Sequence, residues 1–506
     1  MTNFTTLHDM LALQAPASTA LLTPGGVPLP YAKLHQLIAQ TTLALNSMGI
    51  GRSDRVAIVL PNGAEMATAF IAVASACTAA PLNTAYRADE FEFYLSDLNA
   101  KALIVATGSN TPALAVAAKL GIVVIELKAL PEQGAGSFEL LCARQGQAAM
   151  PGLAHADDVA LILHTSGTTS RPKIVPLTHR NVCASARNIS RTLQLSSADR
   201  QLHVMPLFHI HGLIAGVLAP MAVGSMTFCT TGFNALKFFG WMKECKPTWY
   251  TAVPTMHQTI LARAASNMDI VQSNPLRFIR SSSSSMPTQV IAELERVFNA
   301  PLIESYGMTE AAHQMASSPL PPAKRIAGSV GIAAGPDIAI MNVAGELLSA
   351  GEVGEIVIRG ENVTSGYENN SKANAEGFTN GWFRTGDQGT LTADGYLTLT
   401  GRLKEIINRG GEKISPREVD DALMDHPAIA QVVTFGMPHE KLGEEVGAAV
   451  VLREGSAATE QEIRVFAATK LADFKVPRKI LILDEIPKGA TGKLQRIGLA
   501  KKLGLA

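Results

Sequence analysis

The chain of 506 residues is 47% hydrophobic and 17% charged, a balance that supports a large buried core and excludes a disordered protein. Its 43 Lys and Arg residues equal its 43 Asp and Glu residues, so bulk positive charge cannot drive binding to nucleic acid. At about 150 residues per domain, the length predicts roughly three folding units.

Up to about residue 300, short apolar runs alternate with helical patterns. A typical unit is the buried strand predicted at 55–60, which is followed by an Ala-rich helix at 65–80. Further strands are predicted at 102–106, 122–125, 160–163 and 276–280, and a further helix at 288–298. This alternation predicts an α/β fold built on a parallel or mixed sheet.

Residues 201–236 contain no Asp, Glu, Lys or Arg. The stretch is long enough for a membrane-spanning helix, but it holds three histidines and two prolines. Because these residues interrupt the uniform apolar helix that a bilayer favours, we predict buried core and no transmembrane segment.

From about residue 328, the sequence consists of short strand-like segments separated by glycines. The runs at 338–341, 355–359 and 395–400 predict a small antiparallel β unit. A compact α+β unit follows, with predicted helices and strands at 417–424, 430–434, 447–452, 460–471 and 479–483. We therefore predict an N-terminal domain at 1–402 and a C-terminal domain at 403–506.

The five cysteines are scattered, and none belongs to a CxxC pair. This pattern predicts neither a disulfide framework nor a zinc site, and it suits a reducing compartment. The N-terminal segment lacks a basic region followed by an apolar run. We expect a cytoplasmic protein.

The most informative loop spans residues 165–173 (TSGTTSRPK) and follows a predicted buried strand. Hydroxyl side chains, backbone N–H groups and two cations in one turn suit a triphosphate. The Walker sequence GxxxxGK[ST] is absent, which argues against a P-loop enzyme.

The loop resembles the phosphate-binding loop of the adenylate-forming superfamily, which includes acyl-CoA synthetases, luciferase and peptide-synthetase adenylation domains. Four more segments are similar to motifs of this family and occur in its order: YGMTE at 306–310, GWFRTGD at 381–387, GRLKE at 401–405 and PKGATGK at 487–493. The resemblance implies a large N-terminal domain of two α/β subdomains plus a β-barrel, carrying a small mobile C-terminal α+β domain.

The resemblance also implies an activity. ATP and a carboxylic acid would form an acyl-adenylate with release of pyrophosphate, and the acyl group would pass to coenzyme A. Lys493 would bridge the carboxylate and the α-phosphate, Thr309 would contact that phosphate, and Glu310 would bind Mg²⁺. A Lys near a chain end is ordinarily a solvated surface charge, so this role depends on the motif around it.

The remaining nucleotide and coenzyme A positions are implied by the same motifs. Asp387 and Arg402 would bind the ribose, Lys404 would be the hinge, and Gly410, Gly411 and Glu412 would lie by the thiol channel. The expected phosphate-binding and adenine-binding residues are Thr165, Ser166, Gly167, Thr168, Thr169, Lys173, Ser282, Ser283, Ser284, Glu304, Ser305, Tyr306 and Gly307.

The acid pocket is expected to contain polar and cationic groups, which suggests a short polar acid. These groups are His209, which we also place among the catalytic residues, together with His211, Arg280, Ser283 and His313. A second carboxylate needs such partners because an unpaired buried charge is costly. The motif text is most similar to the oxalate–CoA ligase branch. A medium-chain, aromatic or malonate-type acid, or a carrier-protein thiol as acceptor, stays open as an alternative.

Overall fold

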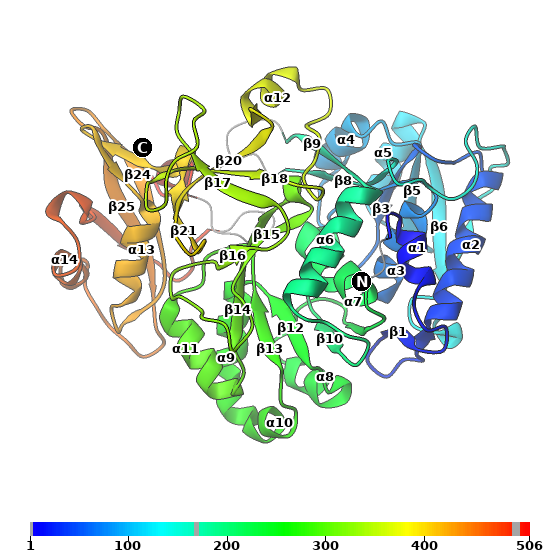
Figure 1. The fold of residues 1–506 in the computed structure, drawn as a ribbon, viewed down its shortest axis with the longest axis horizontal. Helices are drawn as coiled ribbons and strands as arrows, with labels where there is room; N and C mark the ends of the chain where they lie inside the picture. Colours follow the sequence, from blue (N-terminus) through cyan, green and yellow to red (C-terminus); the bar gives the residue numbers. More distant parts are fainter. Residues whose placement is uncertain (1–3, 166–171, 488–495) are drawn as a thin grey trace. The chain divides into compact units, whose positions relative to one another are not determined.

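The computed structural model describes residues 4–165, 172–487 and 496–506 (Figure 1). The chain forms two compact units. Unit 1 combines Met1–Thr165, Pro172–Asp337 and Arg359–Glu376, and unit 2 contains Ile338–Ile358 and Gly377–Ala506. The domain boundary that we placed between residues 402 and 403 stays a prediction.

A seven-stranded sheet forms the first layer of unit 1, in the order β7-β6-β5-β3-β4-β8-β9. Its inner strands are parallel, and the edge strands β7 and β9 run antiparallel to their neighbours. The strands are β3 (Arg55–Val59), β4 (Thr78–Pro81), β5 (Ala102–Ala106), β6 (Val123–Ala129), β7 (Phe138–Leu141), β8 (Val159–His164) and β9 (Ile174–Thr178). Every strand predicted in this region is present.

Six helices accompany this sheet. They are α1 (Leu7–Ala12), α2 (Tyr31–Ser47), α3 (Ala64–Ala74), α4 (Ala88–Asp97), α5 (Ala113–Leu120) and α6 (His179–Thr192). The helix predicted at 65–80 was too long, because α3 ends at Ala74 and the following Ala-rich residues form the buried strand β4. Burial on both faces of a parallel strand hides the alternation that distinguishes strand from helix.

A nine-stranded sheet forms the second layer of unit 1, in the order β16-β15-β14-β13-β12-β10-β11-β1-β2. Its strands are β1 (Thr19–Leu22), β2 (Leu29–Pro30), β10 (Arg200–His203), β11 (Met226–Cys229), β12 (Trp249–Ala252), β13 (Phe278–Ser281), β14 (Leu302–Met308), β15 (His313–Ser317) and β16 (Ile332–Ala333). Strands β10 to β14 and β1 are parallel to their neighbours in that group, so their carboxyl ends share one edge.

The helices that follow these strands are α7 (Ala219–Met221), α8 (Phe238–Cys245), α9 (Pro254–Ala264), α10 (Met268–Ser273) and α11 (Thr288–Phe298). The apolar faces of α8, α9, α10 and α11 pack on the sheet around the buried side chains of Phe238, Tyr250 and Phe298. Helix α6 packs against β8, β9 and β15, so it connects the two sheets. Its start is fixed by Thr178, whose Oγ1 accepts from the backbone N–H of Asn181.

The uncharged stretch lies in the core of unit 1 over residues 201–230, as predicted, whereas its last residues, 231–236, include exposed positions such as Leu236. After β10 it forms a π-helix, His211–Leu218, in which every residue is buried. Two glycines allow this packing: a Cβ on Gly212 would lie 2.2 Å from the carbonyl oxygen of Pro206, and one on Gly216 would lie 2.4 Å from the ring of His203. Within the described residues, no helix is long and apolar enough to cross a membrane.

Unit 2 contains two five-stranded sheets. The first has β17 (Asp337–Met341), β18 (Gly354–Arg359), β19 (Phe378–Thr379), β20 (Trp382–Leu391) and β21 (Leu397–Arg402). Helix α12 (Ser371–Gly377) precedes β19 in the chain and belongs to unit 1 up to Glu376. The second has β22 (Ile407–Arg409), β23 (Glu412–Ile414), β24 (Ile429–His439), β25 (Gly443–Leu452) and β26 (Lys479–Ile482). Its helices are α13 (Pro416–Met424), α14 (Glu460–Ala468) and α15 (Leu499–Lys502). The predicted β unit and the predicted α+β unit are both present.

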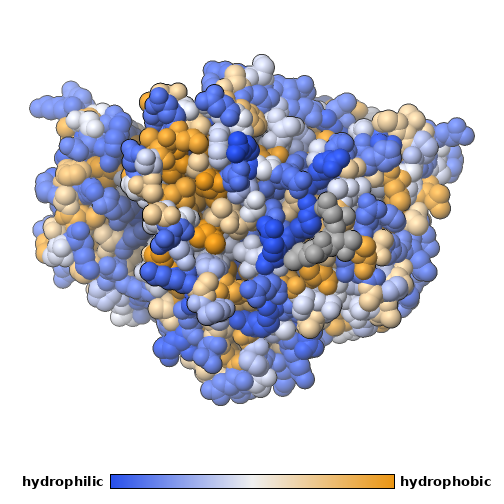
Figure 2. All heavy atoms as spheres, in the orientation of Figure 1, coloured by the Kyte–Doolittle hydropathy of each residue, from blue (hydrophilic) through white to orange (hydrophobic). Residues whose placement is uncertain are grey.

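On the face drawn in Figure 2, hydrophilic residues are widespread and apolar residues lie between them in smaller groups. The five cysteines are thiols, and four of them are buried.

Candidate functional site

The predicted phosphate loop follows β8 and precedes β9, and these two strands pair as antiparallel neighbours. His164 pairs with Ile174 in the ladder, and two further bonds close the base of the loop. The backbone N–H of Thr165 donates to the carbonyl of Lys173 over 3.0 Å, and the N–H of Lys173 donates to Oγ1 of Thr165 over 3.3 Å. This pairing therefore fixes where Lys173 emerges. Ser166, Gly167, Thr168 and Thr169 lie outside the described residues.

Lys173, Tyr367 and Glu310 form a connected group. The Lys173 Nζ lies 3.8 Å from the centroid of the Tyr367 ring, and the Tyr367 hydroxyl donates to Oε1 of Glu310 over 2.7 Å. Glu310 is buried directly after β14, beside the half-buried Thr309. Burial and the nearby Glu310 carboxylate raise the pKa of the Tyr367 hydroxyl, which therefore stays a donor. This group joins the predicted phosphate lysine to the predicted metal ligand.

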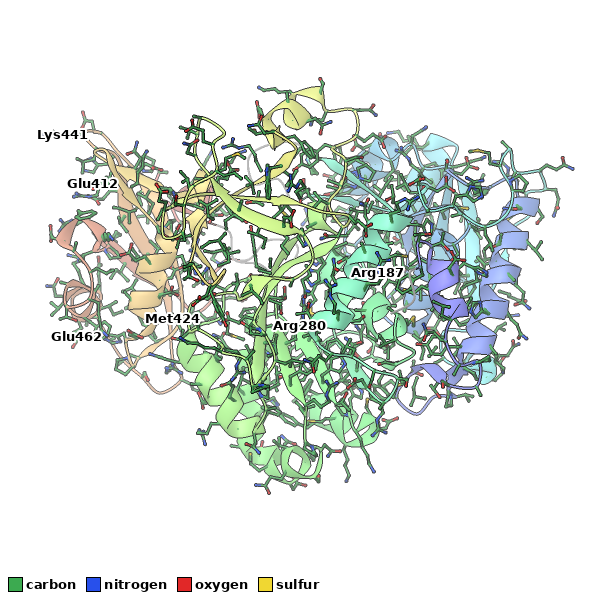
Figure 3. The ribbon with its side chains drawn as sticks, viewed as in Figure 1. Arg187, Arg280, Glu412, Met424, Lys441 and Glu462 are labelled. Atoms are coloured by element: carbon green, nitrogen blue, oxygen red, sulfur yellow. The ribbon has the colours of Figure 1, made fainter. Side chains whose placement is uncertain are left out.

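A buried arginine lies at the carboxyl edge of the nine-stranded sheet. Arg280 is the penultimate residue of β13 and is fully buried within unit 1 (Figure 3). Its register partner on the neighbouring parallel strand β12 is Thr251. Among the described residues its hydrogen-bond partners are two imidazoles, a hydroxyl and an amide oxygen, and no carboxylate pairs with it. Burial lowers the pKa of Arg280 to about 9.

Two imidazoles stack beside this guanidinium. The ring centroids of His211 and His313 are 4.9 Å apart and their planes differ by 17°. His211 Nε2 lies 2.6 Å from Oγ1 of Thr251, and its Nδ1 lies 3.1 Å from the hydroxyl of Ser283. The half-buried His209 is close by, because its Nδ1 accepts from the backbone N–H of His211 over 3.3 Å. The five residues predicted for the acid pocket are thus connected neighbours, and their substrate role stays a prediction.

The backbone that carries His313 is strained. Ala312 and His313 both have positive φ, at 46° and 99°, and His313 begins β15 directly after this turn. The turn brings its carbonyl against the YGMTE motif, where a Cβ on Gly307 would lie 1.6 Å from the carbonyl oxygen of His313. Only glycine fits at position 307, so this motif residue has a packing reason for its identity. Strain of this kind is concentrated at functional sites.

The predicted adenine-binding serines differ in burial and in their hydrogen-bond partners. Ser282 is buried and donates to the carbonyl of Ser305 over 3.0 Å, which ties the end of β13 to β14. Ser283 has a φ of 74° and faces His211, whereas the exposed Ser284 donates to the carbonyl of Ser283. Glu304 is half-buried, and Tyr306 is 8% exposed. Their contact with a nucleotide stays a prediction.

In unit 2, the two predicted ribose residues are cross-strand partners. Asp387 on β20 pairs with Arg402 on β21, and the Arg402 Nε donates to Oδ1 of Asp387 over 3.0 Å. Lys404 is exposed in the short helix Leu403–Glu405 that follows. Gly410 and Gly411, both with positive φ, form the two-residue turn between β22 and β23, and Glu412 begins β23. The thiol-channel role of this turn stays a prediction, and Lys493 lies outside the described residues.

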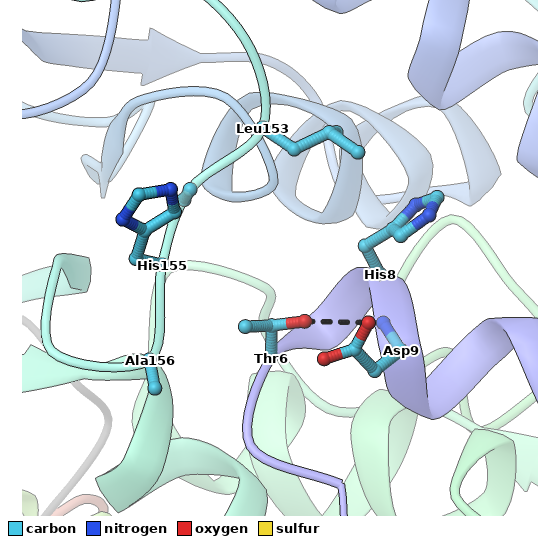
Figure 4. Close-up of a pocket in the computed structure, with 7 residues that line it drawn as sticks. Thr6, His8, Asp9, Leu153, His155 and Ala156 are labelled. Atoms are coloured by element: carbon cyan, nitrogen blue, oxygen red, sulfur yellow. Dashed lines mark hydrogen bonds between the residues drawn. The ribbon is translucent and has the colours of Figure 1, made fainter.

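Unit 1 contains two pockets, of which one lies next to a predicted site residue and the other does not. One of about 170 Å³ is mostly apolar and is lined partly by Pro206, Leu207 and Phe208, directly before His209. The other, of about 420 Å³, is lined by residues 153–156 and the segment around His8 (Figure 4). None of the residues that line this second pocket was predicted for the site.

Two family models match the chain. The model described as AMP-binding enzyme matches residues 10–368, and the model described as AMP-binding enzyme C-terminal domain matches residues 418–493. The chain belongs to the AMP-binding enzymes. The adenylate-forming resemblance drawn from the five motifs is therefore confirmed, and so is the α/β fold class.

This AMP-binding enzyme is 47% identical over 501 residues to the oxalate–CoA ligase of Arabidopsis thaliana, which covers 97% of this chain and 96% of that protein. It is 42% identical over 478 residues to the oxalate–CoA ligase of Saccharomyces cerevisiae, with 89% and 87% coverage. Its structure is similar to the crystal structure of ATP-bound MatB from Rhodopseudomonas palustris, with a TM-score of 0.88 and 27% identity over 98% of each chain.

Three residues of this AMP-binding enzyme's candidate site were missed from the sequence: Thr251, Gln314 and Tyr367. Gln314 directly follows the predicted His313, so its position was a usable signal, whereas Thr251 belongs to none of the five motifs. The sequence held no signal for Tyr367, because this residue lies 57 residues after Glu310 and outside every recognised motif. Within the described residues, no group of three or more His, Cys, Asp or Glu side chains could hold a metal ion.

Proposed function

We propose that this chain is an AMP-forming acid–CoA ligase and that its acid is oxalate. The observation that carries the choice of acid is the buried Arg280, which has no carboxylate partner among the described residues and lies against two stacked imidazoles. The names of the two relatives, both oxalate–CoA ligases, support the same choice.

Electrostatics explains why a diacid suits this pocket. A buried cation without a counter-charge costs several kcal/mol of solvation free energy. The second carboxylate of a short diacid supplies the missing negative charge, whereas an apolar acyl chain would leave the cation unpaired. The neutral imidazoles and the Ser283 hydroxyl add hydrogen-bonding groups at the same place.

The first half-reaction joins the acid to ATP. A carboxylate oxygen attacks the α-phosphorus, the bond from that phosphorus to the bridging oxygen of the β-phosphate breaks, and pyrophosphate leaves. Lys173, Thr165 and Lys493 are proposed to hold the phosphates and neutralise their charge, with Thr309 on the α-phosphate. Asp387 and Arg402 are proposed to bind the ribose.

Mg²⁺ is proposed to bind through Glu310. The fit is chemical, because a buried carboxylate fixed by the Tyr367 hydroxyl offers the hard oxygen ligand that Mg²⁺ prefers, and the phosphates supply others. When bound, the ion would balance charge on the phosphates.

The second half-reaction transfers the acyl group to coenzyme A. The thiol sulfur attacks the acyl carbon, the bond from that carbon to the phosphate oxygen breaks, and AMP leaves. We propose that the segment 403–506 moves about Lys404 between the two steps, so that the turn at Gly410 and Gly411, with Glu412, lies near the thiol. A cytoplasmic location belongs to the same proposal.

A substrate panel tests the proposed function. Pyrophosphate release and CoA consumption are measured with oxalate, malonate, acetate, octanoate and coumarate, and oxalate is expected to give the highest kcat/KM. Reactions without CoA control for the first step alone. A higher kcat/KM for octanoate or coumarate would show that the acid assignment is wrong. A phosphopantetheinyl carrier protein offered in place of CoA tests the alternative acceptor.

A further inference from the structure

The hydrogen atoms of the Arg280 guanidinium are almost all in use. One terminal nitrogen, Nη1, donates to His211 Nε2 and to Thr251 Oγ1, each over 3.3 Å. The other, Nη2, donates to His313 Nε2 over 3.1 Å and to Gln314 Oε1 over 3.2 Å. Two hydrogens on each terminal nitrogen match these four acceptors. The Nε–H that is left is buried without a partner among the described residues, and a single N–H cannot hold a carboxylate by both oxygens.

This arrangement decides the tautomer of both histidines. Arginine donates and never accepts, so it favours a lone pair on each Nε2 that faces it. At His211 the Thr251 hydroxyl decides the tautomer: its oxygen accepts from Arg280, and its own hydrogen has His211 Nε2, 2.6 Å away, as acceptor. Burial, reinforced by His313 and Arg280, lowers the pKa of His211 well below its usual value, so that ring is neutral. A neutral imidazole that accepts at Nε2 carries its proton on Nδ1.

The position of the guanidinium is itself held by Gln314. The Gln314 Nε2 donates to the carbonyl of Ala334 over 3.1 Å and to Oγ1 of Thr192 over 3.3 Å. A carbonyl can only accept, so the amide cannot turn over, and its Oε1 must face Arg280. Thr251 and Gln314 therefore hold the guanidinium from two strands, β12 and β15.

We propose that Arg280 is a positioning residue: it fixes His211 and His313 as a stacked pair of Nδ1–H donors, and these donors hold the second carboxylate of the acid. The inference rests on the proposed function for the identity of that carboxylate. Ser283 marks the side on which the acid lies, because its half-buried hydroxyl is the present partner of His211 Nδ1. The charge of Arg280 favours the anion from behind the rings.

Nitrogen-15 NMR of the full-length protein labelled at its 12 histidines reads the tautomers directly. His211→Asn and His313→Asn variants assign the two sets of signals by their loss. The expected result at neutral pH and without substrate is a protonated Nδ1 and an unprotonated Nε2 in both rings. A protonated Nε2 in either ring would overturn the proposal, whether or not oxalate is the substrate.

Arg280→Met removes the guanidinium and keeps an apolar side chain of similar length. Thermal unfolding checks that the variant folds, because removal of the buried charge relieves a desolvation cost while four buried acceptors lose their donor. We expect at least one of the two rings to change tautomer and kcat/KM for oxalate to fall by about thirtyfold or more. Arg263→Met, at an exposed position on α9, is the matched control and should change neither property.

The outcomes separate the two proposals. Unchanged tautomers and unchanged oxalate kinetics in Arg280→Met would overturn the positioning role. If Arg280→Met does not fold, the wild-type tautomers alone decide. If the wild type shows both Nδ1–H tautomers but does not turn over oxalate, the tautomer assignment stands, whereas the proposed function and the carboxylate contact are wrong.

Discussion

The Tyr367 hydroxyl donates to Oε1 of Glu310 over 2.7 Å, while the Lys173 ammonium lies 3.8 Å from the centroid of the same ring. One aromatic side chain thus orients a proposed metal ligand and positions a proposed phosphate ligand. Lys173 and Glu310 are far apart in the sequence. The hydroxyl of Tyr367 contacts one and its ring face contacts the other, so a substitution that removes only the hydroxyl can test the two contacts separately.

Tyr367→Phe keeps the ring under Lys173 and removes the bond to Glu310. Loss of a partner that orients a metal-binding carboxylate typically weakens metal binding, so the Mg²⁺ concentration for half-maximal pyrophosphate release should rise roughly tenfold. The measurement is a titration of free Mg²⁺ at saturating ATP and oxalate. An unchanged Mg²⁺ dependence would count against Glu310 as the metal ligand.

Gly307→Ala should destabilise unit 1, because its Cβ would lie 1.6 Å from the carbonyl oxygen of His313. A clash with backbone cannot be relieved by a rotamer change, so we expect a loss of about 3 kcal/mol or more in the free energy of unfolding. The matched control is Gly240→Ala on α8, where nothing lies within 4 Å and helix propensity favours alanine. Urea denaturation compares the two variants, and equal midpoints would contradict the prediction.

Three buried histidines should make the protein sensitive to mild acid. Burial lowers the pKa of His179, His203 and His257 to about 4, from an ordinary value of 6.5. Between these values the unfolded chain binds more protons, so the free energy of unfolding is highest above pH 6.5 and falls as the pH drops toward 4. Each histidine should remove roughly 3 kcal/mol over this range.

His179→Asn tests this dependence at one site. The backbone N–H of Leu7 donates to His179 Nδ1 over 3.3 Å, and the Asn oxygen can accept the same bond without titrating. The slope of unfolding free energy against pH should decrease by up to about 1.4 kcal/mol per pH unit. His155→Asn, at an exposed position, serves as the matched control. The prediction fails if both variants keep the wild-type slope.

Asp387→Asn removes the charge that the proposed ribose site offers to the sugar hydroxyls, while the cross-strand pairing with Arg402 can persist. Because hydrogen bonds to an ionised carboxylate are about twice as strong as neutral ones, the Kd for AMP should rise roughly tenfold. Calorimetric titration with AMP measures this change. Asp337→Asn, which alters an exposed pair with Arg359, serves as the control and should bind AMP like the wild type.

Lys493→Ala should stop adenylate formation but leave thioester formation from supplied oxalyl-adenylate largely intact. The physical reason is that the lysine neutralises negative charge only while carboxylate and triphosphate approach each other. Pyrophosphate release reports the first step, and thioester formation from the adenylate and CoA reports the second. Equal loss of both steps would contradict a hinge motion that removes this lysine between them.

The sequence predicted the secondary structure best where its pattern was local. The helix at 288–298 was found at its observed bounds because it has a helical apolar periodicity, and the strand at 160–163 was found near its bounds because it is a short apolar run with polar residues on both sides. The helix at 65–80 was overextended and the π-helix His211–Leu218 was not foreseen. Both errors fall in uniformly buried, Ala- and Gly-rich segments, where neither a period of 2 nor one of 3.6 is visible.

By itself, the sequence determined the family, the α/β class and the identity of the residues in the five motifs, because contiguous motifs in a fixed order need no tertiary information. Only the tertiary structure decided which residues of the acid pocket are hydrogen-bonded to one another. His211, Thr251, Arg280 and Gln314 come from four separate segments. Thr251 and Arg280 meet because their parallel strands end at one edge of the sheet, Gln314 lies near the start of the antiparallel strand β15, and His211 begins the π-helix. The contacts among these residues decide which nitrogen of each imidazole carries a proton. The sequence cannot show this, because the direction of a hydrogen bond between distant residues depends on the folded structure.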